Sequence, residues 1–338
     1  MDVYNADPET DASSFSDLSI GVWGLGKMGL PLAAVLADEG ATVYGVDIDS
    51  ELVDQINSGE SPIRNEPRVP ELVARHGGSQ LKAKTEGTEA AKEVDISIIL
   101  VPTVLDENDE PILTPVIESA KDIAAGVETG DLVILESTVP PGTTTGVLRE
   151  QLEISGLRAG EDFGLAFCPE RTSSGRVVRD LTESYPKIVG GVDQASGTAA
   201  AALYERINEP GVITMTSASA AEAVKVFEGV YRDINIALAN ELAKACEEWG
   251  IDAHSVFDAA NTQPYCNIHQ PGVGVGGHCI PVYPHFVTNQ YAETPLIETA
   301  RSVNTSMPGH TVDRLDDKLA ANGVDLAEAS VLVLGLTY

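Results

Sequence analysis

The sequence predicts an α/β fold in which a doubly wound parallel sheet comes before a helical domain. From Ser19 onward, short apolar runs alternate with helical patterns, the order that builds a parallel sheet covered on both faces. A glycine-rich turn follows the first apolar run, and a long helical pattern runs from Ser217 to about Trp249, before Gly250. The first domain is therefore expected to be a nucleotide-binding type of sheet, and the second all-helical.

The expected strands are continuous apolar runs, as in parallel strands that are buried on both faces. They span residues 20–23, 42–47, 96–101, 132–136 and 163–167. The first two connecting helices are expected over residues 30–39 and 50–58.

Composition and pattern divide the chain into four parts. We expect an acidic disordered tail over residues 1–17, a cofactor-binding sheet domain over 18–215, and a central helical domain over 216–325 that dimerises through its long helix. Residues 326–338 predict the first strand of a second α/β nucleotide-binding domain that is otherwise absent. Because a lone strand has no sheet to join, the sequence is either a fragment or this strand pairs elsewhere.

The charge balance excludes some partners. The 338 residues include 21 Lys and Arg against 52 Asp and Glu, a net charge of −31, which argues against nucleic acids and anionic membranes. An ordinary acidic enzyme is one explanation. We favour a protein of a very salty cytosol, as in a halophilic archaeon, where screening makes such self-repulsion tolerable.

Other sequence features favour a cytoplasmic location. No apolar run approaches membrane-spanning length, and the acidic N-terminus lacks an apolar signal region. None of the four cysteines is in CxxC spacing, so we expect reduced thiols and no metal site.

The glycine-rich turn has the spacing of a dinucleotide-binding motif. Gly24 permits a tight turn, Gly26 lets a pyrophosphate approach the backbone, and Gly29 allows the helix to pack on the strand. Asp47 ends the next strand, where a carboxylate would bind ribose hydroxyls and repel a 2′-phosphate. The context predicts a Rossmann-type domain that binds NAD rather than NADP. The alternative, a glycine-rich turn of an unrelated fold, fits this context poorly.

Polar side chains follow two other predicted strands. Pro102 and Thr103 come after one strand, and Ser137 and Thr138 come after the next. Ligands of parallel sheets bind beyond the carboxyl ends of the strands, so these residues are expected at the cofactor or at the reacting carbon. Taken singly, each hydroxyl is more often an ordinary loop residue.

Glu170 follows a third strand directly and is a candidate base or water-holding carboxylate. A surface ion pair between Glu170 and Arg171 is an equally good interpretation of these two residues alone.

Two cations share a face of the long predicted helix. Lys225, Gly229 and Arg232 follow i, i+4, i+7 spacing, and the two cations would neutralise an oxyanion or hold a substrate. The alternative is that they pair with Glu222 and Glu228 on the surface.

Cys279 ends a glycine run, Gly272-Val-Gly-Val-Gly-Gly-His-Cys. A thiolate there would hold an aldehyde as a thiohemiacetal, which can donate a second hydride. We expect His278 or Lys225 to lower its pKa from about 8.5 toward neutrality. An inert buried thiol is the usual alternative, and it suits Cys246 on the long helix better.

Together these motifs resemble the UDP-glucose/GDP-mannose dehydrogenase family over residues 20–338. The segments that carry the resemblance are the glycine turn, Glu136–Thr144, Lys225 and Gly272–Cys279. Cys168-Pro-Glu-Arg, the segment from Tyr231 to Leu242 and Asn267-Ile-His-Gln-Pro-Gly look like the UDP-N-acetylmannosamine dehydrogenase branch. Glucose-type enzymes carry a second glutamate where this chain has Ser174.

The resemblance implies roles for individual residues. Cys279 would be the nucleophile, Lys225 the acid/base and oxyanion-stabilising group, and Glu170 with Thr138 would position water. The residues expected to contact NAD are Gly24, Gly26, Lys27, Met28, Gly29, Asp47, Pro102, Thr103, Ser137 and Thr138. Those expected to contact the nucleotide sugar are Arg171, Thr172, Lys225, Arg232, Gly272, Gly274 and Tyr338.

The chain departs from the family pattern at two positions near the reacting groups. The family usually has Asn four residues after the lysine, where this chain has Gly229. It commonly has Asp four residues after the cysteine, where this chain has Tyr283.

These features predict an NAD-dependent UDP-sugar 6-dehydrogenase. The expected reaction is a four-electron oxidation of UDP-N-acetyl-D-mannosamine to the uronate, through a cysteine-bound thiohemiacetal and thioester. UDP-glucose 6-dehydrogenase is the first alternative, and a two-electron β-hydroxyacid dehydrogenase is more distant because such enzymes lack the cysteine loop. A third alternative is an inactive paralogue that only binds the dinucleotide and dimerises.

The acidic charge predicts that salt stabilises the folded protein. Screening shortens the range of the repulsion from about 10 Å at 0.1 M salt to about 3 Å at 1 M. The melting temperature should therefore rise as KCl is increased from about 0.1 M to about 2 M, because repulsion among surplus acids outweighs the weakening of ion pairs. A melting temperature that stays flat or falls over that range would contradict the salt-adapted interpretation.

Overall fold

The computed structural model describes residues 2–5 and 15–335. It divides into two compact units, which we describe separately. The first, the sheet unit, comprises Met1–Val104 with Pro111–Lys225, and the second, the helical unit, comprises Leu105–Glu110 with Val226–Tyr338. The boundary lies inside the long helix α9 (Ala218–Glu248), ten residues beyond the 215/216 boundary expected from the sequence.

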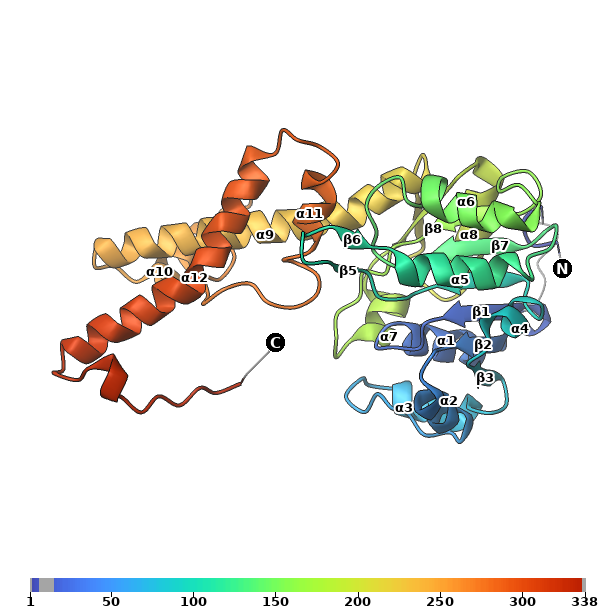
Figure 1. Ribbon diagram of the computed structural model, residues 1–338, viewed down its shortest axis with the longest axis horizontal. Coiled ribbons are helices and arrows are strands. Elements are labelled where there is room, and N and C mark those ends of the chain that lie inside the picture. The colour runs from blue at the N-terminus through green and yellow to red at the C-terminus, as the bar shows by residue number, and fades with distance from the viewer. Residues whose placement is uncertain (1, 6–14, 336–338) are drawn as a thin grey trace. The chain divides into compact units, whose positions relative to one another are not determined.

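The sheet unit contains an eight-stranded sheet (Figure 1) in the order β10-β9-β8-β7-β4-β1-β2-β3. Its strands are β1 (Ser19–Trp23), β2 (Thr42–Val46), β3 (Leu81–Lys84), β4 (Ile96–Ile99), β7 (Leu132–Leu135), β8 (Gly164–Phe167), β9 (Lys187–Gly191) and β10 (Val212–Thr214). The five strands expected from apolar runs are all present, with ends shifted by at most two residues. Strand β1 pairs with β2 on one side and β4 on the other, so chain order reverses there.

Helices cover both faces of this sheet, and the pleat decides which side chains reach each face. In β1, Ile20 and Val22 lie in one apolar cluster and Trp23 lies in the other. Helices on the first face are α1 (Gly29–Asp38), α2 (Ser50–Asn57), α3 (Val69–His76), α7 (Val177–Arg179) and α8 (Gln194–Tyr204). Those on the second face are α4 (Gly87–Ala91), α5 (Thr114–Ala124), α6 (Arg149–Leu152) and the start of α9.

The sequence predicted a parallel sheet, but one strand of the observed sheet breaks that pattern. Strand β9 runs antiparallel to β8, although β10 is parallel to β9. The reversal brings Lys187, the first residue of β9, to the edge where β7 ends. There its Nζ lies 3.0 Å from Glu136 Oε2, both side chains being buried. The Tyr204 hydroxyl also donates to Glu136, and Lys187 lies 4.5 Å from the centre of the Tyr204 ring.

The helical unit contains the rest of α9 with α10 (Ala253–Ala260), α11 (Tyr283–Thr288) and α12 (Pro295–Ala320). Helix α12 crosses α9 (Figure 1), and buried polar groups join the two. Arg301 lies 2.5 Å from Asp233, Asn304 donates to the same carboxylate at 2.9 Å, and Asn240 donates to Asn304 at 3.0 Å. This network fixes where the two helices meet.

The helical unit also includes one segment from outside residues 216–325, the range expected for the helical domain. It includes the tip, Leu105–Glu110, of the hairpin formed by β5 (Val104–Leu105) and β6 (Pro111–Ile112). Asn289, at the end of α11, donates from Nδ2 to the Asp109 carbonyl at 2.8 Å and to the Glu110 carboxylate at 3.2 Å.

Both ends of the chain differ from the sequence prediction where they are described. Residues 2–5 and 15–17 belong to the segment expected to be a loose tail, yet Tyr4 and Phe15 are buried and the Val3 and Tyr4 amides donate to the Gly130 carbonyl. Burial of these two rings favours an ordered position. Residues 330–335 form no strand and their apolar side chains are exposed, because no neighbouring strand pairs with them. Tyr338 lies outside the described residues.

The buried Glu136–Lys187 pair predicts a large loss of stability for Lys187→Met. Burial raises the pKa of the Glu136 carboxyl and the Lys187 charge opposes that rise, so removing the cation leaves an uncompensated buried acid. Breaking such a pair costs about 3–5 kcal/mol, measurable by urea unfolding. The double variant Glu136→Gln/Lys187→Met should recover most of this loss. If Lys187→Met alone unfolds at the wild-type urea concentration, the pair contributes nothing.

Candidate functional site

The glycine turn after β1 has the geometry that a dinucleotide requires. Gly24 has φ +94°, and a Cβ there would collide with the Leu100 carbonyl at the end of β4. A Cβ on Gly29 would collide with the Gly24 carbonyl, so α1 starts in direct contact with the turn. At Gly26, by contrast, no described atom beyond its two chain neighbours lies within 4 Å of an added Cβ. The open space lies where a pyrophosphate would approach the backbone.

Asp47 is fixed beside this turn. It follows β2, and its Oδ2 accepts a hydrogen bond of 2.8 Å from the Leu25 amide while Oδ1 accepts one of 3.1 Å from Asp49. The half-buried carboxylate is thus held at the position expected to recognise a ribose. The next residue, Ile48, is 98% exposed, an apolar surface that sequence analysis did not single out. A flat apolar group such as adenine would find a partner there.

Hydrogen bonds join the loops that follow β4 and β7. The Thr103 hydroxyl donates to the Thr138 carbonyl at 2.5 Å. The Ser137 hydroxyl accepts from the Val101 amide and donates to the Val101 carbonyl, both at 2.8 Å. Ser137 is buried and its hydroxyl is engaged in joining two strand ends, so its expected contact with cofactor has no support from its geometry. Pro102 is exposed at the same edge.

Glu222 holds the loop after β7. Its carboxylate accepts hydrogen bonds from the Gly142 amide at 2.5 Å, the Thr144 amide at 2.8 Å and the Thr144 hydroxyl at 2.6 Å. Burial raises the pKa of this carboxyl, and the Thr144 hydrogen bonds oppose that rise. The sequence interpretation treated Glu222 only as a surface partner of the helix cations. The sequence signal for its role was Gly142 and Thr144, which follow a strand and whose backbone amides require hydrogen-bond acceptors.

The segment after β8 turns back toward the glycine turn. Cys168 is buried, and burial raises the pKa of its thiol, so it is an inert core residue. Glu170 accepts a hydrogen bond from the Thr172 amide, and the Thr172 hydroxyl lies 3.2 Å from Met28 Sδ. The structure thus brings together Met28, Thr172 and Glu170, three of the residues expected to bind cofactor or substrate or to position water.

Arg171 packs in a different direction from Glu170. Its Nη1 donates to the Pro186 carbonyl at 3.2 Å, and the guanidinium lies 5.0 Å from the centre of the Tyr185 ring. The Tyr185 hydroxyl donates to the Arg171 carbonyl at 2.6 Å. These contacts hold the Arg171 side chain against Tyr185 and Pro186.

The three α9 residues singled out from the sequence differ in their exposure to solvent. Lys225, the last residue of the sheet unit, is 7% exposed, and Gly229 is buried within the helical unit. Arg232 is exposed, and its charge, after the larger effect of burial, lowers the pKa of His269. A buried lysine suits proton transfer, and an exposed arginine suits a charged ligand.

The glycine loop of the helical unit presents Cys279 to solvent. The Gly272 amide donates to Asn240 Oδ1 at 2.8 Å, and Gly274 has φ +152°, with an added Cβ 3.4 Å from Pro308. Cys279 is exposed, whereas Cys246 on α9 is buried, as the sequence predicted for an inert thiol. Cys266 is half-buried, so Cys279 is the cysteine best placed to meet a ligand.

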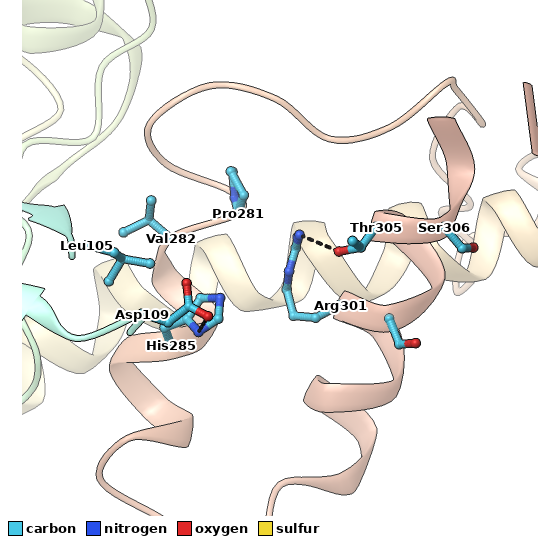
Figure 2. Close-up of a pocket in the computed structure, with 9 residues that line it drawn as sticks. Leu105, Asp109, Pro281, Val282, His285, Arg301, Thr305 and Ser306 are labelled. Carbon is cyan, nitrogen blue, oxygen red and sulfur yellow. Dashed lines mark hydrogen bonds and ion pairs between the residues drawn. The ribbon is translucent and has the colours of Figure 1, made fainter. Parts of the chain in front are cut away.

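A cavity of about 690 Å³ lies next to the Cys279 segment, within the helical unit. Figure 2 shows Asp109 and His285 facing each other and Arg301 reaching toward Thr305. His285 Nδ1 lies 4.0 Å from Asp109, and Arg301 donates to Thr305 at 3.4 Å. The walls of the cavity come from the hairpin tip, from the start of α11 with the two residues before it, and from α12. The lining residues are Leu105, Asp109, Pro281, Val282, His285, Arg301, Ser302, Thr305 and Ser306. These residues share no sequence motif, because only tertiary structure brings their three separate segments together.

The described residues contain neither a membrane-spanning helix nor a cluster of metal-binding side chains. None of the helices over 2–5 and 15–335 combines the length and apolar character needed to cross a membrane. Across the same ranges, no three His, Cys, Asp or Glu side chains gather in a way that would hold a metal ion.

Comparison with known families identifies both units. Residues 18–208 match the NAD binding domain of the UDP-glucose/GDP-mannose dehydrogenase family, and residues 219–306 match its central domain. The chain belongs to this family. It is therefore an NAD-dependent nucleotide-sugar dehydrogenase. This confirms the family resemblance that the sequence motifs indicated.

Individual members of the family are similar to this chain over most of its length. The chain is 38% identical over 322 residues to UDP-N-acetyl-D-mannosamine dehydrogenase of Pyrococcus horikoshii, covering 95% of this chain and 76% of the relative. It is 41% identical over 306 residues to NDP-N-acetyl-D-galactosaminuronic acid dehydrogenase of Ralstonia nicotianae, covering 88% and 71%. The structure of UDP-D-ManNAc dehydrogenase from Pyrococcus horikoshii superposes with a TM-score of 0.90, at 38% identity over 95% of this chain and 76% of that one.

The geometry of Asp47 predicts the cofactor preference of the sheet unit. Asp47→Asn keeps an acceptor for the Leu25 amide but removes the charge that would pair with ribose hydroxyls and repel a 2′-phosphate. We expect binding of NAD to weaken about tenfold to a hundredfold, as for a lost hydrogen bond to a charged group, and the preference over NADP to fall. Isothermal titration with each dinucleotide measures both. Asp49→Asn, two residues on, is the matched control. Equal binding of NAD and NADP by the unmutated protein would contradict this role.

Proposed function

We propose that the protein is a UDP-sugar 6-dehydrogenase whose substrate is UDP-N-acetyl-D-mannosamine, oxidised at C6 to UDP-N-acetyl-D-mannosaminuronate. The observation that carries the proposal is Cys279, an exposed thiol on a glycine loop of a chain whose other domain binds NAD. Hydride transfer alone needs no cysteine, whereas oxidation beyond the aldehyde needs a group that holds it. The named function of the Pyrococcus horikoshii relative supports the choice of sugar.

NAD would be held by the glycine turn Gly24–Gly29, by Asp47 and by the loops carrying Thr103 and Thr138. When bound, it accepts hydride from the carbon being oxidised. The open space at Gly26 and the fixed carboxylate of Asp47 both fit such a ligand. Lys27, Met28 and Pro102 complete the expected contact set, and Ser137 supports it indirectly through the strand ends that it joins.

The chain's own residues carry the rest of the reaction. In the first half, Lys225 takes the proton of the C6 hydroxyl as hydride leaves, and it stabilises the oxyanion formed when the Cys279 thiolate adds to the aldehyde. In the second half, the thiohemiacetal loses a second hydride together with its hydroxyl proton and becomes a thioester. Water held by Glu170 and Thr138 then releases the uronate and the thiol. Two hydrides and three protons leave and one water oxygen enters, which balances oxidation of an alcohol to a carboxylate.

The remaining expected substrate contacts are Arg171, Thr172, Arg232, Gly272, Gly274 and Tyr338. Arg232 is the exposed cation among them and suits the diphosphate. We also propose that the chain dimerises through α9, whose exposed apolar side chains Phe227, Tyr231 and Leu238 would be covered in such a dimer.

A second substrate has specific support. The higher identity to the Ralstonia nicotianae relative favours a nucleotide-linked N-acetylgalactosamine sugar as the alternative. UDP-glucose is less favoured, since Ser174 stands where glucose-type enzymes carry glutamate. The deciding measurement is NADH formed per sugar consumed, over a panel of these three nucleotide sugars. Two NADH per sugar supports the proposal; one NADH supports a two-electron enzyme, and none supports an inactive paralogue.

Cys279→Ser should abolish carboxylate formation while leaving NAD binding nearly unchanged. A serine hydroxyl lacks the nucleophilicity of a thiolate, so we expect a loss of at least about a thousandfold in uronate production. Cys266→Ser, in the same unit, is the matched control. Uronate production by Cys279→Ser at a rate near that of the wild type would show that the covalent mechanism is wrong.

A further inference from the structure

The two positions at which this chain departs from its family pattern touch each other. A Cβ added to Gly229 would lie 3.0 Å from both Cβ and Cγ of Tyr283, and closer still to Cδ2. The Tyr283 ring therefore occupies the space that any larger residue at 229 would need. Gly229 lies within α9 and Tyr283 begins α11, so this contact joins two helices of the helical unit.

The side chain of Tyr283 is buried among apolar side chains. Its side chain is 5% exposed and belongs to a cluster with Val226, Val230 and Phe286. The ring centres of Tyr283 and Phe286 are 6.0 Å apart. Burying a tyrosine ring of this kind stabilises its position by several times the thermal energy.

Tyr283 is connected directly to the thiol segment. The Cys279 carbonyl accepts hydrogen bonds from the Val282 and Tyr283 amides, each at 3.0 Å. These bonds form the turn that leads into α11. A displacement of the Tyr283 ring would consequently move the Cys279 backbone, together with Pro281 and Val282 in the wall of the cavity.

The rest of the loop has little else to hold it. Among residues 271–283, all of which the structure describes, Tyr283 alone is buried. Upstream, Gly272 is tied to Asn240 on α9. Gly229 and Asn240 are eleven residues apart on that helix, about three turns, so the loop is fastened at both ends to one face of α9.

We propose that Tyr283, seated on Gly229, is the positioning residue for the Cys279 thiol, and that glycine at 229 and tyrosine at 283 form a matched pair. An asparagine at 229 would exclude the ring, and an aspartate at 283 would leave the space over Gly229 unfilled. Each departure from the family pattern is therefore tolerated because of the other. The assignment of Cys279 as the reacting thiol rests on the proposed function; the steric pairing does not.

The test compares Gly229→Asn, Tyr283→Asp and the double variant in the full chain. Gly309→Asn is the matched control, because Gly309 is also helical and, apart from its chain neighbours and its own helix backbone, no described atom lies within 4 Å of an added Cβ there. The readouts are the iodoacetamide alkylation rate of Cys279, followed by mass spectrometry of its peptide, and kcat with KM for NAD. Alkylation needs no substrate, so it reports on the pairing even if the sugar has been misassigned.

We expect Gly229→Asn to change the alkylation rate of Cys279 and to lower kcat about tenfold to a hundredfold with little change in KM for NAD, the effect of misplacing a reacting group. The double variant should move both values back toward the wild type. Tyr283→Phe keeps the ring on Gly229 and should keep the alkylation rate. Tyr283→Leu removes the ring without adding bulk, and should change the rate even if Gly229→Asn does not fold.

Three results would overturn the proposal. One is an unchanged alkylation rate in both Gly229→Asn and Tyr283→Leu. Another is a double variant no closer to the wild type than either single variant. The third is a Tyr283→Phe variant altered as much as Tyr283→Leu, because the hydroxyl rather than the seated ring would then position the thiol. A wild-type protein that oxidises none of the nucleotide sugars would overturn the proposed function instead, and leave these comparisons intact.

Discussion

The architecture of the sheet unit depends on close backbone contact at the carboxyl edge of the sheet. Gly24 meets the Leu100 carbonyl and Gly29 meets the Gly24 carbonyl, at distances that no side chain would permit. Only this contact lets α1 start against the strand ends while open space remains over Gly26. The ends of β1, β2 and β4 then converge on one edge, which is where a parallel sheet of this kind is expected to bind its ligand.

Buried polar groups fix the loops around that edge. The antiparallel direction of β9 delivers Lys187 to Glu136, immediately before Ser137 and Thr138. Glu222 serves the following loop by accepting three hydrogen bonds from Gly142 and Thr144. Such groups contribute little net stability, but their loss leaves charges or amides unpaired in the interior. These buried groups hold the loop after β7, which carries expected site residues, in one conformation.

The helical unit holds a glycine-rich loop in place while leaving the Cys279 thiol of that loop exposed. Glycines give the loop its positive φ angles and remove the side chains that would anchor it. The anchors are therefore placed at its two ends, Asn240 upstream and Gly229 downstream, both on α9. Because Asn240 also bonds Asn304, the same polar network that sets the crossing of α9 and α12 positions the loop.

The sequence by itself determined the α/β class, five strands, the long helix and the tight turn at Gly24–Gly29, and it singled out Asp47 and Cys279 as candidate site residues. These depend on periodicity, apolar runs and turn glycines, which act over a few residues. Tertiary structure alone decided the reversal of β9, the burial of Tyr4 and Phe15, the engagement of Ser137 and the absence of a strand over residues 330–335. Each of these depends on a partner distant in the chain, and a sequence pattern carries no record of which distant groups will meet. The Gly229–Tyr283 contact belongs to this second kind: each residue alone is a departure from its family, and only the fold shows that they form one fitted pair.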